Sequence, residues 1–361
     1  MQKLKKYAAS KAGRDTLLSF GIVIIAYVVM QAMLATGAVS SLVQSLLVPI
    51  CAYIILAVSL NLTVGILGEL SLGHAGFMSV GAFSGVVAAT TLADAVPFEP
   101  LRLALAIIVG GICAAVAGVI VGVPVLRLKG DYLAIVTLAF GEIIKNIINV
   151  LYVGLDGAGL HFSLLQQSFQ LEEGGKMIIN GAMGVSGVSR LSSFTSGFVL
   201  VLITLFIILN LIHSRAGRAI MSVRDNKIAA DSIGISTTRY KLMAFVISAA
   251  FAGMAGTLYG MNYTTITAAK FDFNTSILIL VFVVLGGLGN IWGSIIAATV
   301  LTVLPELLRE VGNYRMLIYA ILLIAMMLFN NSSLKQRILE KRGMKQMEKL
   351  ENAGQSGKEG A

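Results

Sequence analysis

Charged residues are scarce in this chain of 361 residues, where Asp, Glu, Lys and Arg together make up only 12%. Soluble domains carry roughly 25% charged residues. Hydrophobic residues account for 57% of the sequence, and the mean hydropathy is +0.87. These values exclude an ordinary water-soluble domain and indicate a protein whose solvent is the lipid bilayer.

Cysteine, histidine and the common catalytic motifs are also sparse. The two cysteines, Cys51 and Cys113, lie inside long apolar runs, and the three histidines form no cluster with them. A disulfide framework or a zinc site needs more thiols at suitable spacing. No segment has the phosphate-cradling form G-x-x-x-x-G-K-[S/T], and no G-x-S-x-G elbow is present. We therefore expect no metal site, no cofactor bound by this chain, no catalytic residues and no ATPase activity of its own.

The net charge of +9 is distributed in a way that argues against a nucleic-acid partner. Most basic residues fall in three short segments beside apolar runs, at 3–14, 215–241 and 335–349. Cytoplasmic loops of membrane proteins carry such an excess of Lys and Arg. Aromatic residues are not interleaved with them, as binding to single-stranded nucleic acid would require. We expect the basic segments to set the orientation of the chain in the membrane.

Apolar runs recur along the chain at lengths close to the roughly 20 residues that cross a bilayer. The sequence predicts an all-α polytopic bundle of about ten transmembrane helices within a transmembrane domain at 15–330, and a count of eight would satisfy the same charge pattern. The glycine-rich stretch 286–290 should interrupt the bundle as a break or a re-entrant element. The predicted spans are residues 17–35, 42–64, 70–91, 102–126, 131–152, 196–213, 242–262, 274–288, 291–308 and 314–330.

The basic loops also predict which side of the membrane each loop faces. With a cytoplasmic tail at 1–14, an even number of spans places loop 214–241 and the tail at 331–361 inside. The acidic, proline-bearing loop 94–100 and the longer loop 153–195 then fall outside. We therefore predict a multi-pass protein of a bacterial plasma (inner) membrane with both termini in the cytoplasm.

Residues 61–83 combine glycines with polar side chains inside predicted spans. Close helix packing explains glycines spaced four apart, such as Gly81 and Gly85. Polar groups at membrane depth are costly and usually face a cavity or a partner. We expect those near this helix junction to line or brace a substrate pathway. They are Asn61, Glu69, Ser71 and His74.

Glu142 and Lys145 share one face of the span predicted at 131–152, because they are three residues apart. Glu142 lies about 16 Å along a helix that begins near Asp131, close to the middle of the bilayer. We expect the two side chains to form an ion pair, which is either structural or part of the pathway.

Loop 214–241 joins two spans and contains helix-forming residues. The sequence predicts a short helix over 225–233, with Asp225-Asn226 as its N-cap and Gly234 as its stop. A helix of this composition cannot bury itself in lipid. We therefore expect it to dock on a cytoplasmic partner.

Six stretches of the chain resemble the permease subunit of branched-chain amino-acid ABC importers, of the LivM type. The resemblance runs over residues 50–330 and is most specific at the first and fourth stretches. They are SLGHAGF (71–77), DYLAIVTLAFGEI (131–143), NGAMGVSGV (180–188), SRAGRA to AFAGMAG (214–256), SILILVFVVLGGLGNIWGSIIAA (276–298) and LPELLR (304–309).

The resemblance implies a subunit that forms the pathway for leucine, isoleucine and valine by alternating access. It implies a second permease of the LivH type, two ATPase subunits that bind ATP-Mg, and an extracytoplasmic solute-binding protein. It places the ATPase-coupling motif in loop 214–241, where Lys227 stands at a position more often acidic in the family. The coupling residues carried over are Arg224, Ala229, Ala230, Asp231 and Gly234. The pathway candidates are Asn61, Ser71, His74, Phe77, Thr137 and Glu142.

Other interpretations of the same residues stay open. A urea or short-chain amide permease shares the features at 71–77 and 214–256, and no residue pattern fixes the substrate. A secondary transporter driven by H⁺ or Na⁺ would need intramembrane groups that load and unload protons or ions. A scaffold protein is disfavoured by the predicted cytoplasmic helix. The candidates for ion coupling are Glu69, His74, Glu142 and Lys145.

Overall fold

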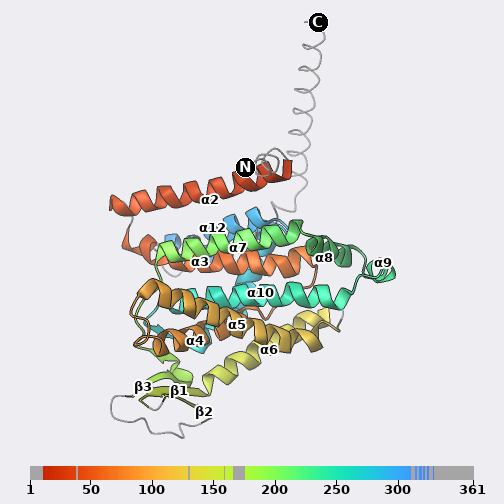
Figure 1. The fold of residues 1–361 in the computed structure, drawn as a ribbon. Helices are drawn as coiled ribbons and strands as arrows, with labels where there is room; N and C mark the ends of the chain where they lie inside the picture. The colour runs from red at the N-terminus through yellow and green to blue at the C-terminus, as the bar shows by residue number, and fades with distance from the viewer. Residues whose placement is uncertain are drawn as a thin grey trace. The chain divides into compact units, whose positions relative to one another are not determined.

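The computed structural model describes residues 11–37, 40–128, 131–157, 159–165 and 175–309, together with isolated residues between 314 and 328. Helices make up most of this part of the chain (Figure 1). The longer ones are α2 (Lys11–Ala35), α3 (Ser41–Asn61), α4 (His74–Thr91), α5 (Glu99–Val125), α6 (Asp131–Asn149), α7 (Phe194–His213), α10 (Thr237–Gly260), α11 (Phe273–Gly286) and α12 (Ile291–Leu307).

Five of the described helices are long and apolar enough to cross a membrane, as expected of a multi-pass membrane protein. They cover Val43–Ile66, Glu99–Val125, Tyr132–Asn149, Phe194–His213 and Thr237–Gly260. Shorter apolar helices coincide with other predicted spans, at Val23–Ala35, Phe273–Gly286 and Ile291–Leu307. The predicted span at 314–330 and the two predicted tails lie largely outside the described residues, so the count of ten stays a prediction.

The chain divides into two compact units, Met1–Val303 and Leu304–Ala361. The first contains nearly all the described residues. In the second, Arg309 donates a hydrogen bond to Glu306 one helical turn away (2.9 Å).

The prediction of an all-helical chain is wrong at the loop predicted over 153–195, which contributes four strands to an antiparallel sheet of order β2-β1-β3-β4-β5. Gly184 (φ +69°) lets β4 approach β5, because a Cβ there would lie 2.1 Å from the carbonyl oxygen of Ile266. The fifth strand, β5, follows α10 in the sequence, so the sheet joins the loop to a second segment of the chain. The strands are β1 (Leu151–Asp156), β2 (Gly159–Leu164), β3 (Lys176–Asn180), β4 (Val185–Ser186) and β5 (Thr265–Ile266).

Helices α4, α5 and α10 pack against one another through glycines. A Cβ on Gly81 of α4 would lie 2.1 Å from the carbonyl oxygen of Gly253 in α10. A Cβ on Gly110 of α5 would lie 2.0 Å from Oγ1 of Thr257, whose hydroxyl donates to the carbonyl of Gly81 (2.8 Å). The packing role predicted for Gly81 and Gly85 is confirmed, since both lie against α10.

Two of the apolar elements are interrupted. A π-helical turn at Leu62–Ile66 and a non-helical segment join α3 to α4, and residues 62–73 are called here the first chain break. Between α11 and α12, Gly287 (φ +95°) and Gly289 (φ +80°) adopt backbone conformations that favour glycine. Residues 287–290 are the second chain break, and the interruption predicted at 286–290 is confirmed.

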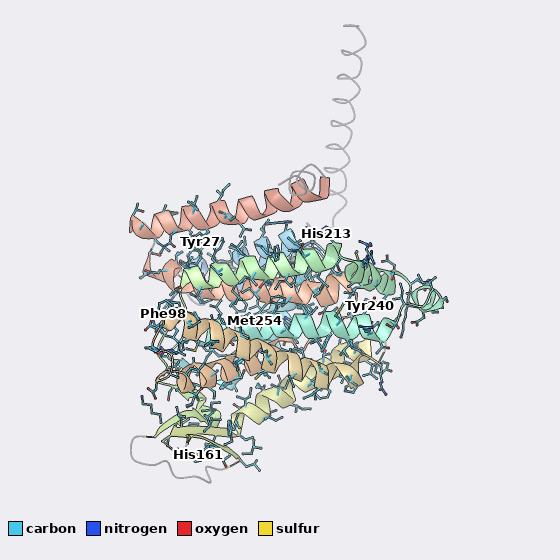
Figure 2. The ribbon with its side chains drawn as sticks, in the orientation of Figure 1. Tyr27, Phe98, His161, His213, Tyr240 and Met254 are labelled. Atoms are coloured by element: carbon cyan, nitrogen blue, oxygen red, sulfur yellow. The ribbon has the colours of Figure 1, made fainter. Side chains whose placement is uncertain are left out.

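The two ends of the helix bundle carry different elements. Helices α8 (Arg215–Asp225) and α9 (Lys227–Ser232) lie at one end of the long helices, and β1, β2 and β3 lie at the opposite end (Figure 1). We call these the α9 end and the sheet end. Figure 2 shows His213 and Tyr240 at the α9 end and Phe98 at the sheet end. Loops predicted to face opposite sides of the membrane therefore lie at opposite ends of the bundle.

Candidate functional site

Loop 214–241 folds into two short helices whose ends are fixed by local hydrogen bonds. Ser214 caps α8 by accepting from the backbone N–H of Gly217 (3.1 Å). Asn226 caps α9 by accepting from the N–H of Ala229 (3.0 Å). Gly234 (φ +84°) follows α9 in the left-handed region, which favours glycine. Within the range predicted for a short helix, 225–233, the structure has α9 at Lys227–Ser232, capped by Asn226 alone because Asp225 ends α8, and its coupling role stays a prediction.

Three of the four coupling residues predicted in and beside α9 are exposed, and Ala230 is the exception. Ala230 is only 2% exposed and faces its own chain, whereas Ala229, Asp231 and Gly234 are exposed. Ile228 and Ile233 are 80% and 75% exposed, and neither was among the predicted coupling residues. The loop has four isoleucines, and their spacing alone does not show that Ile220 is buried while Ile228 and Ile233 are exposed.

Arg224, another predicted coupling residue, reaches the first chain break. Its guanidinium donates to the carbonyl of Gly65 (3.2 Å) and to Asp225 (2.9 Å). Its aliphatic stem lies against Gly68 (φ +79°), where a Cβ would be 2.6 Å from Cγ of Arg224. Close packing of the arginine stem on bare backbone therefore fixes the end of α8 against this break.

Glu69 and Lys241 form an ion pair between the first chain break and α10. The side chains are 15% and 10% exposed. Buried charges are normally paired, because a lone one pays a large desolvation cost. Glu69 was predicted as a polar group near a helix junction and as a candidate for ion coupling, and Lys241 as one of several basic loop residues, but their pairing was not predicted.

Asn61 joins the two chain breaks. Its side-chain Nδ2 donates to Ser294 of α12 (2.9 Å), and its Oδ1 accepts from the backbone N–H of Gly289 (2.8 Å). Asn61 and Ser294 are both 0% exposed. The side-chain amide of Asn61 thus accepts a hydrogen bond from the backbone N–H of Gly289, which has no helical partner in the second chain break.

Most other pathway candidates are also bonded or packed within the bundle. Nε2 of His74 lies 2.9 Å from Oγ of Ser59. Thr137 of α6 accepts from the backbone N–H of Leu72 (3.0 Å). Phe77 is buried edge-on against Phe245 of α10, with ring centroids 5.5 Å apart. These three side chains brace the surroundings of the first chain break.

Ser71 and Glu142 differ from these bracing residues. Ser71 is 2% exposed, and its hydroxyl has no hydrogen-bond partner in the part of the chain that the structure describes. Glu142 is one-third exposed, pairs with Lys145 as predicted, and accepts from the backbone N–H of Phe273 (3.2 Å) at the start of α11. Because α11 follows β5 closely in the chain, Glu142 lies towards the sheet end, apart from α9.

These features define a multi-pass membrane protein of the transporter class. They are the apolar spanning helices, the two interrupted elements joined by buried polar contacts, and the short capped helix at one end. Irregular backbone at membrane depth is tolerated where protein buries it or where it lines a cavity. The described residues include no group of three or more His, Cys, Asp or Glu side chains that could hold a metal ion.

The chain belongs to the family of permease components of branched-chain amino acid transport systems. The family model for "Branched-chain amino acid transport system / permease component" matches residues 42–329. The chain is 37% identical over 297 residues to the LivM permease proteins of Salmonella typhimurium and Escherichia coli, covering 78% of this chain and 67% of each relative. It is 36% identical over 95 residues to the LivH permease of Salmonella typhimurium, covering 26% of this chain and 30% of the relative. No solved structure matches the chain.

Proposed function

We propose that this chain is the LivM-type permease subunit of an ABC importer and forms the pathway for leucine, isoleucine and valine. The similarity to LivM proteins over 297 residues supports the substrate class. The observation that carries the mechanism is α9, a capped helix that exposes Ile228 and Ile233 beside the first chain break. Exposed apolar side chains rimmed by polar ones are typical of a protein interface.

The proposed partners are a second permease of the LivH type, two ATPase subunits and an extracytoplasmic solute-binding protein. ATP-Mg binds to the ATPase subunits, and this chain hydrolyses nothing by itself. The α9 end faces the cytoplasm of a bacterium and the sheet end faces outward, with ten spans and both termini inside. The position of loop 214–241 and Phe98 at opposite ends of the bundle supports this orientation (Figure 2).

The pathway passes beside the first chain break and along α6. Asn61, His74, Phe77 and Thr137 brace its wall through the contacts described above, and they touch substrate only if those contacts open. Ser71 and Glu142 retain free acceptor or donor capacity and are the candidates for direct contact. A zwitterionic amino acid presents an ammonium and a carboxylate that such groups can bind.

Transport by the assembled importer tests this function. Proteoliposomes should contain the chain, the second permease, the ATPases and the binding protein, with no H⁺ or Na⁺ gradient. We expect uptake of radiolabelled leucine that requires ATP inside and binding protein outside, and no uptake by the chain alone. ATP-driven uptake of urea or acetamide without leucine uptake would identify the amide permease instead. Uptake by the chain alone under an ion gradient would identify a secondary transporter.

A further inference from the structure

The ion pair between Glu69 and Lys241 is not explained by folding alone. Glu69 lies in the non-helical part of the first chain break, and Lys241 lies in the first turns of α10, where its helix requires no charge. A buried ion pair is often no more stabilising than an apolar pair of similar size. The pair does provide a directional contact across 172 residues of sequence, between this break and the helix that follows loop 214–241.

Arg224 forms a second contact between the same two regions. It leaves the last turn of α8, bonds Gly65 and packs on Gly68, so that loop 214–241 holds the break at two points, Arg224 near its middle and Lys241 at its end. Residues of both contacts line one cleft of about 420 Å³. Its lining includes Glu69, Arg224, Lys227 and Lys241. The polar part of the break is therefore linked to the loop by a few side chains that also line this cleft.

The apolar part of the break packs on the same two helices. Leu62, Ile66 and Leu67 form one buried cluster with Ile220 of α8 and Ala244 of α10. A displacement of α8 and the start of α10 must therefore displace the π-helical turn as well, because close-packed side chains transmit strain.

The movement would continue to the second chain break through Asn61. This residue precedes the π-helical turn and bonds both Gly289 and Ser294. The non-helical residues of the first break have few backbone hydrogen bonds, among them Glu69 N–H to Thr63 (3.1 Å), so that this segment can rearrange at modest cost. Loop, first break and second break thus form one contiguous set of contacts, which energetic coupling between sites needs.

We propose that the Glu69–Lys241 ion pair, with Arg224 on Gly65, transmits movement of loop 214–241 to the two chain breaks and so links ATP hydrolysis to opening of the pathway. The inference rests on the proposed docking of this loop on an ATPase subunit. Glu69 and Lys241 are positioning residues: they act on the chain breaks and touch neither substrate nor ATP.

Charge reversal in the assembled importer tests the proposal. The variants are Glu69→Lys, Lys241→Glu and the double variant that carries both, and the readout is leucine taken up per ATP hydrolysed. We expect each single variant to lower this ratio by about tenfold and the double variant to restore most of it, because only the double variant re-forms the pair. The reversal Arg309→Glu, which breaks an exposed ion pair, should leave the ratio unchanged.

A second double variant separates coupling from folding. Glu69→Gln with Lys241→Met keeps the volume and removes both charges, so it should assemble normally and still lower the ratio. The proposal is overturned if this neutral variant couples like the wild type. It is also overturned if the charge-reversed double variant assembles but stays uncoupled, or if the single variants lose only assembly while their ratio is unchanged. A wild-type complex that takes up no leucine with ATP would instead overturn the proposed function.

Discussion

Replacing Gly253 with valine is expected to leave almost no folded protein. A Cβ at this position would lie 2.3 Å from Cβ of Ala114 and 2.6 Å from the carbonyl oxygen of Gly110 in α5. Gly253 is also tightly packed on α4, because its carbonyl oxygen would lie only 2.1 Å from a Cβ placed on Gly81. Helix packing in membranes depends on such small residues, and backbone atoms cannot move aside as flexible side chains do.

The measurement is the yield of monodisperse protein in detergent, together with its melting temperature. We expect the yield of Gly253→Val to fall by about tenfold, since overpacking costs about 1–3 kcal/mol or more where backbone is displaced. Gly21→Val is the matched control, because a Cβ on Gly21 of α2 meets nothing within 4 Å. Equal yields and melting temperatures for the two variants would show that α4, α5 and α10 do not pack through these glycines.

Replacing Ile228 with aspartate is expected to abolish ATP-driven transport without unfolding the chain. Ile228 is 80% exposed, so its replacement removes little packing from the folded subunit. If α9 docks in an ATPase groove, the substitution buries an unpaired carboxylate there. A loss of about 2 kcal/mol, typical for an interface hot spot, would weaken ATPase binding by about thirtyfold.

The affinity of the purified permease pair for the ATPase subunits measures this effect directly. Thr238→Asp is the matched control, because Thr238 is also exposed at the α9 end and carries no large apolar surface. We expect the control to bind as the wild type does and both variants to keep the wild-type melting temperature. Normal ATPase binding by Ile228→Asp would mean that the partner docks elsewhere on the chain.

The parts of the fold that the sequence predicts correctly depend on neighbouring residues. Asn226 and Gly234 mark the ends of α9 because a cap and a left-handed glycine act within one helical turn. Gly81 and Gly85 indicate a packing face through their spacing alone. The glycines at 286–290 indicate a break because they favour backbone conformations that end a helix.

The parts that the sequence does not predict depend on contacts between distant residues. Strand β4 pairs with β5 through Val185 and Ile266, although helices α7 to α10 lie between the two strands in the sequence. Asn61 and Gly289 are 228 residues apart. Glu69 and Lys241 are each explained locally, as a junction residue and as a cytoplasmic charge, and only the fold shows that they form a pair.

Crosslinking at α9 tests most directly whether this loop is the contact with the ATPase. In a variant whose Cys51 and Cys113 have been replaced, Ser232→Cys places one exposed thiol on α9, and Ser189→Cys places one exposed thiol beside β3 and β4 at the sheet end. In the assembled importer, we expect a short thiol-to-thiol crosslinker to join position 232, and not position 189, to an ATPase subunit that carries a cysteine in its own groove. Failure of position 232 to crosslink in a complex that transports leucine, or crosslinking from position 189, would contradict the assignment of α9 as the coupling helix.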